Sequence, residues 1–219
     1  MFRPHSLINR LSKMPTLRLF THLSSLSIAI SFSTLSYAQT GVELSAKKQP
    51  SFAECKVSLA EIASQQGISN TRIMSEIPNL TQIPKVLEFD RNQPEFMQTF
   101  PSYYGARVNQ WRIEKGHETL TEHKNFLADL TKKYGIPGHY LLAFWGLETN
   151  FGNYKGKMST LDSLATLACD PRRSEYFTGE LMLALKLMDR ESLTKSQMIG
   201  SWAGAMGHTQ FMPTAYTKY

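Results

Sequence analysis

The sequence predicts a mainly α-helical domain, and three observations support that prediction. Apolar residues recur at helical spacing in several segments, each bounded by a residue that starts or stops a helix. No segment shows the clear alternation of a half-buried strand. Apolar residues make up 42% of the 219 residues, which is enough for a buried core and excludes a disordered chain. This length predicts one domain, or at most two small ones.

The expected elements of the first half follow from their caps and breakers. Ser51 is expected to cap a helix that Gly67 stops. The four prolines of 78–101 predict a mostly extended or looped stretch. Two helices are expected next, one at about 102–115 that ends at Gly116 and one at about 118–134 that ends at Gly135.

The second half begins with the most apolar helix of the chain. Pro137 suits its first turn, and the helix runs through Glu148 until Gly152 closes it. Because it is apolar nearly all round, we expect it to be central and buried. Two helices are expected after it, one capped by Thr160 and running through Ala168, the other capped by Asp170, with Pro171 in its first turn, and running to about Met188.

Residues 1–38 are predicted to be a signal peptide for export. They contain four basic residues and no acidic ones, then a modest apolar run at 23–35 that ends in Ser36-Tyr37-Ala38, a small-x-small cleavage pattern. The run is too short and too polar to span a bilayer. An organelle transit peptide and a signal anchor are the alternatives. Residues 39–50 are polar and without periodicity, and are predicted to be a linker.

The net charge of +6 does not indicate a nucleic-acid partner. Outside the predicted signal peptide the basic residues exceed the acidic ones by only two, which is too weak a field for that purpose. The two cysteines, Cys55 and Cys169, do not fit the spacing of zinc ligands. After export they would meet an oxidising compartment and could form a disulfide, with two buried free thiols as the alternative.

Glu148 is the most informative residue for chemistry. It lies in an apolar run with Phe144, Trp145, Leu147 and Phe151, so we expect its carboxyl group to be desolvated and its pKa raised. A carboxyl group that stays protonated near neutral pH can act as a general acid towards a glycosidic oxygen. The alternative is a glutamate at a helix end that turns to solvent or pairs with a lysine.

A second chemical feature is the Gly- and Ala-rich segment 200–207, whose backbone is expected to approach a ligand closely. It leads into Gln210, whose amide both donates and accepts hydrogen bonds, as sugar hydroxyls and acetamides require. Aromatic side chains can stack on sugar faces, although each one taken singly is more often a core residue. The candidates for such stacking are Trp145, Trp202, Tyr216 and Tyr219.

On these segments the chain resembles the lytic murein transglycosylase B family, bacterial enzymes that cut peptidoglycan. The matching stretches are DRNQPEF at 90–96, RIEKG at 112–116, YGIP at 134–137, GLETNFG at 146–152, DPRRSEYF at 170–177 and GSWAGAMGHTQFMP at 200–213. The resemblance covers about residues 50–219. Its most specific part is the pair GLETNFG and AGAMGHTQFMP in that order.

The resemblance implies a lysozyme-like helical domain over residues 51–219, in the periplasm. Glu148 matches the family's single catalytic acid/base, and Ser201 and Gln210 match positions that line the cleft beside it. Arg172 and Arg173 match a pair that faces the acidic stem peptides, with a salt bridge at a helix start as the alternative. The implied partner is peptidoglycan, with other cell-wall enzymes as a further class to consider. No cofactor and no metal are implied.

The family reaction is not a hydrolysis. Glu148 would protonate the oxygen between N-acetylmuramic acid and N-acetylglucosamine, and then take the proton of the C6 hydroxyl as a 1,6-anhydro ring closes. The alternatives are a non-catalytic peptidoglycan-binding protein and a glycan hydrolase. An inverting hydrolase needs a second carboxylate, for which Asp162 and Glu175 are nearest in sequence.

The resemblance stops at Tyr219, where the family's pattern continues. It therefore implies a domain that is C-terminally truncated relative to the family, with weakened or absent catalysis. It also implies exposed apolar side chains among Phe211, Met212, Tyr216 and Tyr219.

Overall fold

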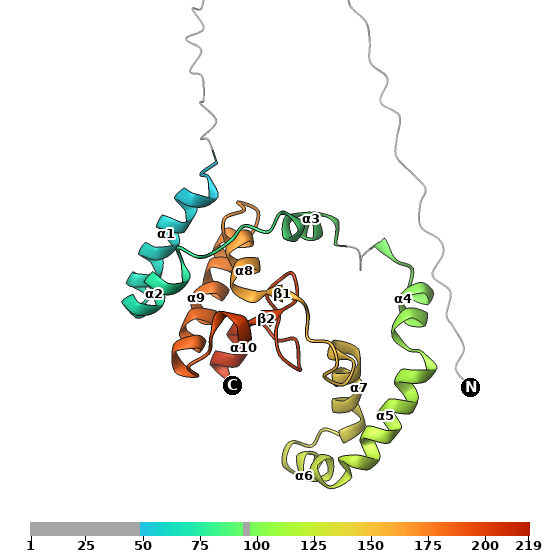
Figure 1. Cartoon of the computed structure of the whole chain (residues 1–219). Helices are drawn as coiled ribbons and strands as arrows, with labels where there is room; N and C mark the ends of the chain where they lie inside the picture. Colours follow the sequence, from blue (N-terminus) through green and yellow to red (C-terminus); the bar gives the residue numbers. More distant parts are fainter. Residues whose placement is uncertain (1–48, 94–96) are drawn as a thin grey trace, which may run out of the picture. The chain divides into compact units, whose positions relative to one another are not determined.

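The structure is a computed structural model that describes residues 49–93 and 97–219. The predicted signal peptide and nearly all of the predicted linker lie outside the described residues. The elements are α1 (Phe52–Gln65), α2 (Asn70–Glu76), α3 (Pro84–Asn92), α4 (Phe100–Arg107), α5 (Gln110–Glu122), α6 (Lys124–Tyr134), α7 (Gly138–Thr149), β1 (Met158–Ser159), α8 (Thr160–Ala168), α9 (Ser174–Arg190), the 3₁₀ helix η2 (Lys195–Gln197), β2 (Ile199–Gly200) and α10 (Pro213–Lys218) (Figure 1). The mainly α prediction is confirmed.

The first helix forms as its caps predict. The Ser51 hydroxyl accepts from the Glu54 backbone N–H at 3.2 Å, and the Glu54 carboxylate accepts from the Ser51 N–H at 2.7 Å. This reciprocal capping box satisfies two of the N–H groups that a helix start leaves free. Gly67 follows the helix with φ +76°, a left-handed conformation that suits glycine.

The core is built on α8 and α9, which lie side by side in Figure 1. Every residue of α8 is buried. Leu161 and Leu164 of α8 and Leu181 and Leu185 of α9 are fully shielded from solvent. Helices α3 and α10 pack against this pair, and α1 adds Leu59 and Ala63 to the same cluster.

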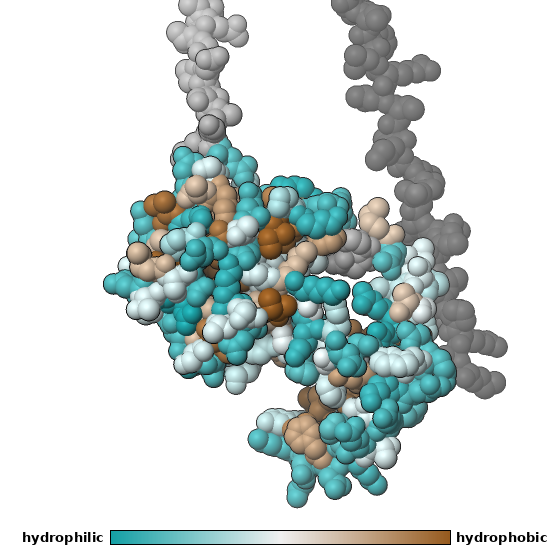
Figure 2. Space-filling view, viewed as in Figure 1, coloured by the Kyte–Doolittle hydropathy of each residue, from teal (hydrophilic) through white to brown (hydrophobic). Residues whose placement is uncertain are grey.

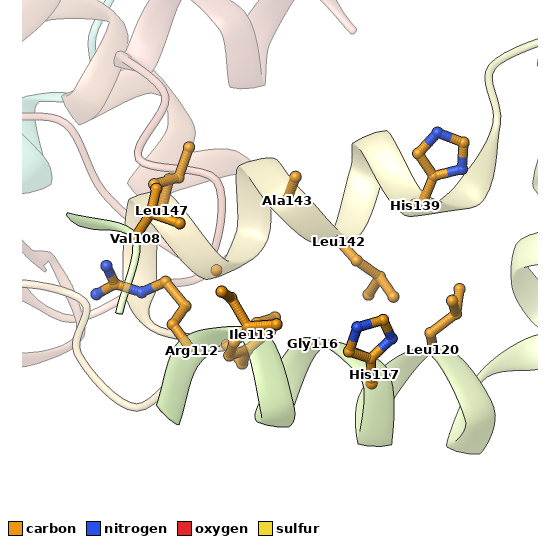
Figure 3. Close-up of a pocket in the computed structure, with 12 residues that line it drawn as sticks. Val108, Arg112, Ile113, Gly116, His117, Leu120, His139, Leu142, Ala143 and Leu147 are labelled. Carbon is orange, nitrogen blue, oxygen red and sulfur yellow. The ribbon is translucent and has the colours of Figure 1, made fainter. Parts of the chain in front are cut away.

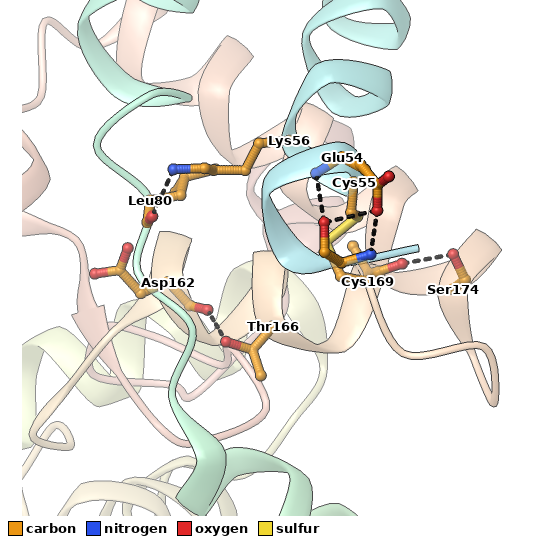
Figure 4. The surroundings of a disulfide bond; sticks show 10 residues. Glu54, Cys55, Lys56, Leu80, Asp162, Thr166, Cys169 and Ser174 are labelled. Atoms are coloured by element: carbon orange, nitrogen blue, oxygen red, sulfur yellow. Dashed lines mark hydrogen bonds between the residues drawn. A yellow bond between two sulfur atoms is a disulfide. The ribbon is translucent and has the colours of Figure 1, made fainter. Parts of the chain in front are cut away.

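A disulfide joins α1 to the end of α8. Cys55 and Cys169 are bonded, with their Cα atoms 5.8 Å apart and a sequence separation of 114 (Figure 4). Of the two outcomes that the sequence left open, the disulfide is the one observed. Close by, Lys56 donates to the carbonyl of Leu80 at 3.3 Å and ties the segment after α2 to α1.

The helices of the first half differ from prediction in several places. Helix α2 was not expected, and the helix expected at about 118–134 is divided at His123 into α5 and α6. Helix α3 lies within the proline-rich stretch, because Pro84 occupies its first turn, where the missing N–H costs no hydrogen bond. Gly116 does not end a helix but lies inside α5, because α5 begins only at Gln110 after a break at Val108. Gly135 ends α6 as predicted, in the left-handed conformation.

Three starts and stops in the second half are also corrected. Helix α7 ends at Thr149, and Asn150 caps it in the left-handed conformation ahead of Gly152. Ser159, rather than Thr160, caps α8. Helix α9 begins at Ser174, because the Asp170 carboxylate is instead bound by the Arg91 side chain at 2.6 Å and by the Arg172 N–H at 3.1 Å.

The segment after α9 returns to the start of α8. Strands β1 and β2 pair antiparallel, with Met158 opposite Gly200. Isolated bridges then link Gly200 to Met206 and Met206 to Phe211, so that segment 200–213 folds back on itself beside β1. None of the helices in the described ranges is long and apolar enough to cross a membrane.

Candidate active site

The last turn of α7 is held against segment 200–213 through His208. The indole N–H of Trp145 donates to Nδ1 of His208 at 3.1 Å. The hydroxyl of Thr149 donates to the His208 carbonyl at 3.0 Å and accepts from the Gly152 N–H at 3.1 Å. Glu148 therefore lies on the helical turn that makes these contacts, next to the segment that carries Gln210.

Glu148 itself is exposed, which contradicts the predicted desolvation. Within the described residues its carboxylate has no hydrogen-bond or ion-pair partner. The cause is the packing of α7, which lies against α5 and α6. Its remaining apolar side chains face solvent, with Phe144 65% and Leu147 38% exposed, so the expectation of a central, buried helix is also wrong. Tan and brown atoms mark this apolar surface over α6 and α7 in Figure 2.

Gln210 and Ser201 are positioned by the turns of their own segment. Gln210 has φ +49°, and its amide nitrogen donates to the carbonyls of Lys155 at 3.1 Å and Gly207 at 3.0 Å. The Ser201 hydroxyl accepts from the Ala205 N–H at 3.1 Å. Both groups keep capacity for a ligand, since the Gln210 carbonyl oxygen can accept and the Ser201 hydroxyl can donate.

The glycines of segment 200–207 serve packing inside the protein rather than the predicted close approach of a ligand. A Cβ placed on Gly204 would lie 2.4 Å from a methyl carbon of Leu164 in the core helix α8. A Cβ on Gly207, which has φ +70°, would lie 2.3 Å from the Tyr216 hydroxyl. At these two positions the neighbour that excludes a side chain is therefore another part of the chain.

The aromatic residues of this region divide into structural and exposed ones. Trp202 packs against the core, with its ring 6.3 Å from that of Phe89. Tyr216 also packs against the core and donates to the Met206 carbonyl at 2.7 Å. The expectation of sugar stacking is therefore not supported for these two. Phe211 is 54% exposed, and Tyr219 is 96% exposed.

Arg172 and Arg173 both bind Asp90, which is 2% exposed. Arg172 also donates to the Asp90 carbonyl at 2.8 Å. Burial alone would raise the pKa of Asp90, but the hydrogen bonds and positive charges of the two arginines outweigh burial and hold that pKa below its ordinary value. The salt-bridge alternative for this arginine pair is thus the one observed, with Asp90 of α3 as the partner.

An apolar hollow of about 270 Å³ lies between α5 and α7 (Figure 3). Ile113, His117 and Leu120 of α5 face Leu142 and the rest of the α7 lining across it. Glu148 is not part of this lining. No group of three or more residues suited to binding a metal ion occurs within residues 49–93 and 97–219.

The two candidate second carboxylates are not brought to Glu148. Asp162 is nearly buried and accepts from Lys195 at 2.8 Å and from the Thr81 N–H at 2.9 Å. Glu175 lines a separate hollow with Arg172 and Arg173. Glu148 is therefore the carboxylate that the described residues offer for acid–base chemistry at the end of α7.

The sequence patterns do not predict the contacts of His208 and Asp90. His208 lies inside the matched segment, between Gly207 and Gln210, but nothing in the pattern indicated a bond from α7. Asp90 opens the DRNQPEF stretch, and the signal that could have indicated it was the salt-bridge alternative for Arg172 and Arg173, which needs an acidic partner.

Known proteins are similar to this chain over most of its length. The family described as "Transglycosylase SLT domain" matches residues 51–219. The chain is 38% identical over 169 residues to membrane-bound lytic murein transglycosylase B of Escherichia coli strain K12. That alignment covers 73% of this chain and 47% of the relative, so the chain spans about half the length of this curated relative.

Solved structures agree in fold. SltB3 from Pseudomonas aeruginosa, in complex with NAG-NAM-pentapeptide, matches with a TM-score of 0.72 and 34% identity, over 77% of this chain and 45% of that one. Escherichia coli Slt35, in complex with bulgecin A, matches with a TM-score of 0.68 and 28% identity, over 75% of this chain and 54% of that one. The chain has the lysozyme-like helical fold of these enzymes and belongs to the lytic transglycosylase family with the SLT domain.

Proposed function

We propose that the protein is a peptidoglycan lytic transglycosylase. It cleaves the β-1,4 bond from N-acetylmuramic acid to N-acetylglucosamine and leaves a 1,6-anhydro end. The observation that carries the proposal is the placement of Glu148 on the turn of α7 that Trp145 and Thr149 bind to His208, beside the segment of Gln210. Family membership and the glycan-peptide ligand of the SltB3 structure support the choice of substrate.

One carboxyl group serves both steps of this reaction. Glu148 first donates its proton to the glycosidic oxygen, and the leaving N-acetylglucosamine departs with that proton. The neighbouring acetamide of the substrate stabilises the positive charge that develops at the anomeric carbon. Glu148, now a carboxylate, removes the proton of the C6 hydroxyl, whose oxygen closes the ring on the anomeric carbon. The proton that Glu148 donates in the first step is replaced by the C6 hydroxyl proton in the second. The reaction therefore needs neither water nor a second carboxylate.

Gln210 and Ser201 are proposed to bind the sugars beside Glu148. With its nitrogen bound to Lys155 and Gly207, the Gln210 amide presents an acceptor for a sugar hydroxyl or an acetamide N–H. Ser201 presents a donor. For Arg172 and Arg173, a role in binding stem peptides requires competition with Asp90, so the pair is proposed to act mainly as a structural clamp between α3 and the start of α9.

Mass analysis of digested peptidoglycan tests the proposal. Products of a transglycosylase are each one water lighter than products of hydrolysis. Anhydro ends from the purified chain support the proposal. Muramic acid with a reducing end would instead support the hydrolase alternative, and binding without any product would support the non-catalytic alternative.

Export to the periplasm through residues 1–38 remains part of the proposal, as does the division into signal peptide, linker 39–50 and catalytic domain 51–219. The cleavage pattern that ends at Ala38 and the cell-wall substrate support both. Sequencing the N-terminus of the protein recovered from the periplasm tests them, since an end at Gln39 is expected.

A further inference from the structure

A groove of about 940 Å³ adjoins the candidate site at His208. It is lined by the loop 153–157, by the end of α9, by η2 and β2, and by residues 206–208. His208 belongs to this lining and also binds Trp145 of α7. The Lys155 carbonyl, in the same lining, accepts from the Gln210 amide. A molecule in this groove would therefore lie next to the groups proposed to bind the sugar.

The charges in the groove are mostly positive. Lys155 and Lys157 are exposed and have no ion pair within the described residues. Arg190 is bound to Glu191 at 2.7 Å, and Glu191 is the one carboxylate in the described lining. No carboxylate of the described residues therefore neutralises the two lysines, unlike Arg172 and Arg173, which Asp90 binds. The Lys157 ammonium group lies 5.9 Å from the centre of the Tyr154 ring.

The rest of the lining suits a peptide. Asn153, Ser196 and Gln197 add amide and hydroxyl groups that can bond to a peptide backbone. The Gln197 oxygen accepts from Thr194, which leaves the Gln197 amide nitrogen for a carbonyl of a ligand. Tyr154 adds an aromatic surface at the edge. Lysine ammonium groups bind carboxylates as mobile point charges, so they do not require one fixed ligand geometry.

We propose that this lysine groove, formed around Lys155 and Lys157, binds the acidic peptide branch that the glycan substrate carries. The inference rests on the proposed function and extends it to recognition of the peptide. While the sugar chain lies at Glu148 and Gln210, its peptide extends past His208, and its carboxylates pair with the two lysines.

The test compares two substrates with the double variant Lys155→Ala/Lys157→Ala. The substrates are peptidoglycan with its peptides and glycan strands from which an amidase has removed them. Exposed ion pairs are weak singly, so we expect the double change to raise KM on the peptide-bearing substrate roughly three- to tenfold, with kcat little changed. The rise should shrink at high salt, because salt screens exposed charges. On stripped glycan the variant should match the unaltered protein.

A matched control removes the same charge elsewhere. Lys132→Ala/Lys133→Ala changes two exposed lysines in the last turn of α6, which do not line the groove, and should leave KM unchanged on both substrates. An equal rise of KM on both substrates, an equal effect of the control pair, or no effect of the Lys155/Lys157 pair would each overturn the proposal. Anhydro products from stripped glycan test the proposed function separately, because that reaction does not depend on the groove.

Discussion

The indole nitrogen of Trp145 lies 3.1 Å from Nδ1 of His208, and this hydrogen bond joins the helix of Glu148 to the segment of Gln210. In this bond Nδ1 of the His208 ring is the acceptor. With the Thr149 hydroxyl on the His208 carbonyl, two contacts from one helical turn fix the same residue. The spacing between the proposed acid and the proposed sugar-binding amide depends on this link.

Removing the acceptor should loosen this link. His208→Leu deletes Nδ1, and we expect it to lower the free energy of unfolding by about 0.5–1.5 kcal/mol and to lower kcat. His208→Asn is the matched control, because its side-chain oxygen can accept near the position of Nδ1. Thermal unfolding and turnover of the two variants provide the check. Equal losses of stability and turnover in the two variants would show that the hydrogen-bond acceptor of His208 does not cause the effect.

Acid should weaken the clamp around Asp90. The pKa of this carboxyl is lowered in the folded protein, so its contribution to stability is fully present above the unfolded value of about 3.9. That contribution is lost as pH falls from there through the lowered folded value. Unfolding followed from pH 7 to pH 2 should therefore show a steeper acid limb in the unaltered protein than in Asp90→Asn, which cannot titrate.

The same variant should be less stable at neutral pH. Asp90→Asn removes the charge that faces Arg172 and Arg173, and we expect a loss of roughly 1–3 kcal/mol in the free energy of unfolding. Equal stability of the two proteins at pH 7 would mean that the arginines are as well satisfied by water as by Asp90.

The disulfide should be a major source of stability. Joining Cys55 to Cys169 closes a long loop, and the chain-entropy treatment gives about 4–5 kcal/mol for a loop of this size. The double variant Cys55→Ala/Cys169→Ala should show that loss in denaturant unfolding, and the unaltered protein should show a similar loss when a reductant is added. Two free thiols titrated in the unfolded, unreduced protein would contradict the pairing.

A side chain at Gly207 should destabilise the protein. Gly207→Ala places a methyl group against the Tyr216 hydroxyl in a left-handed backbone position, and we expect a cost of roughly 1–3 kcal/mol in unfolding free energy. Adding Tyr216→Phe removes the clashing oxygen, so the two changes together should cost less than the sum of their single effects. Additive losses would mean that backbone strain alone sets the cost.

The sequence predicted those features of the fold that depend on neighbouring residues in the chain. Helix caps such as Ser51 and Gly135 and the helical spacing of apolar residues depend only on residues close in sequence. These local signals were enough to predict the fold class. The disulfide between Cys55 and Cys169 was one of two open outcomes, and only the packing of α1 on α8 decided it. The prolines of 78–101 predict no helix because proline breaks a helix interior, but Pro84 lies in a first turn, where it can start one.

The details of the site depend on contacts between distant segments. The apolar run around Glu148 predicted burial, but burial requires a neighbour on each face. Helix α7 packs mainly against α5 and α6, and its face with Phe144 and Glu148 stays exposed. The arginine pair was found by sequence, whereas its partner Asp90 lies 82 residues away from Arg172 in the chain. The role of His208 likewise follows only from its hydrogen bonds to α7, which join segments distant in sequence.

The most direct test of the account is the rate at which Glu148→Gln forms anhydro products from peptidoglycan. Glutamine matches glutamate in size but cannot donate the proton, and loss of general acid–base catalysis should lower the rate roughly 10²–10⁴-fold. Because Glu148 is exposed and has no partner within the described residues, the variant should unfold at the same temperature as the unaltered protein. Formation of anhydro products by Glu148→Gln at the unaltered rate would contradict the assignment of Glu148 as the catalytic acid/base.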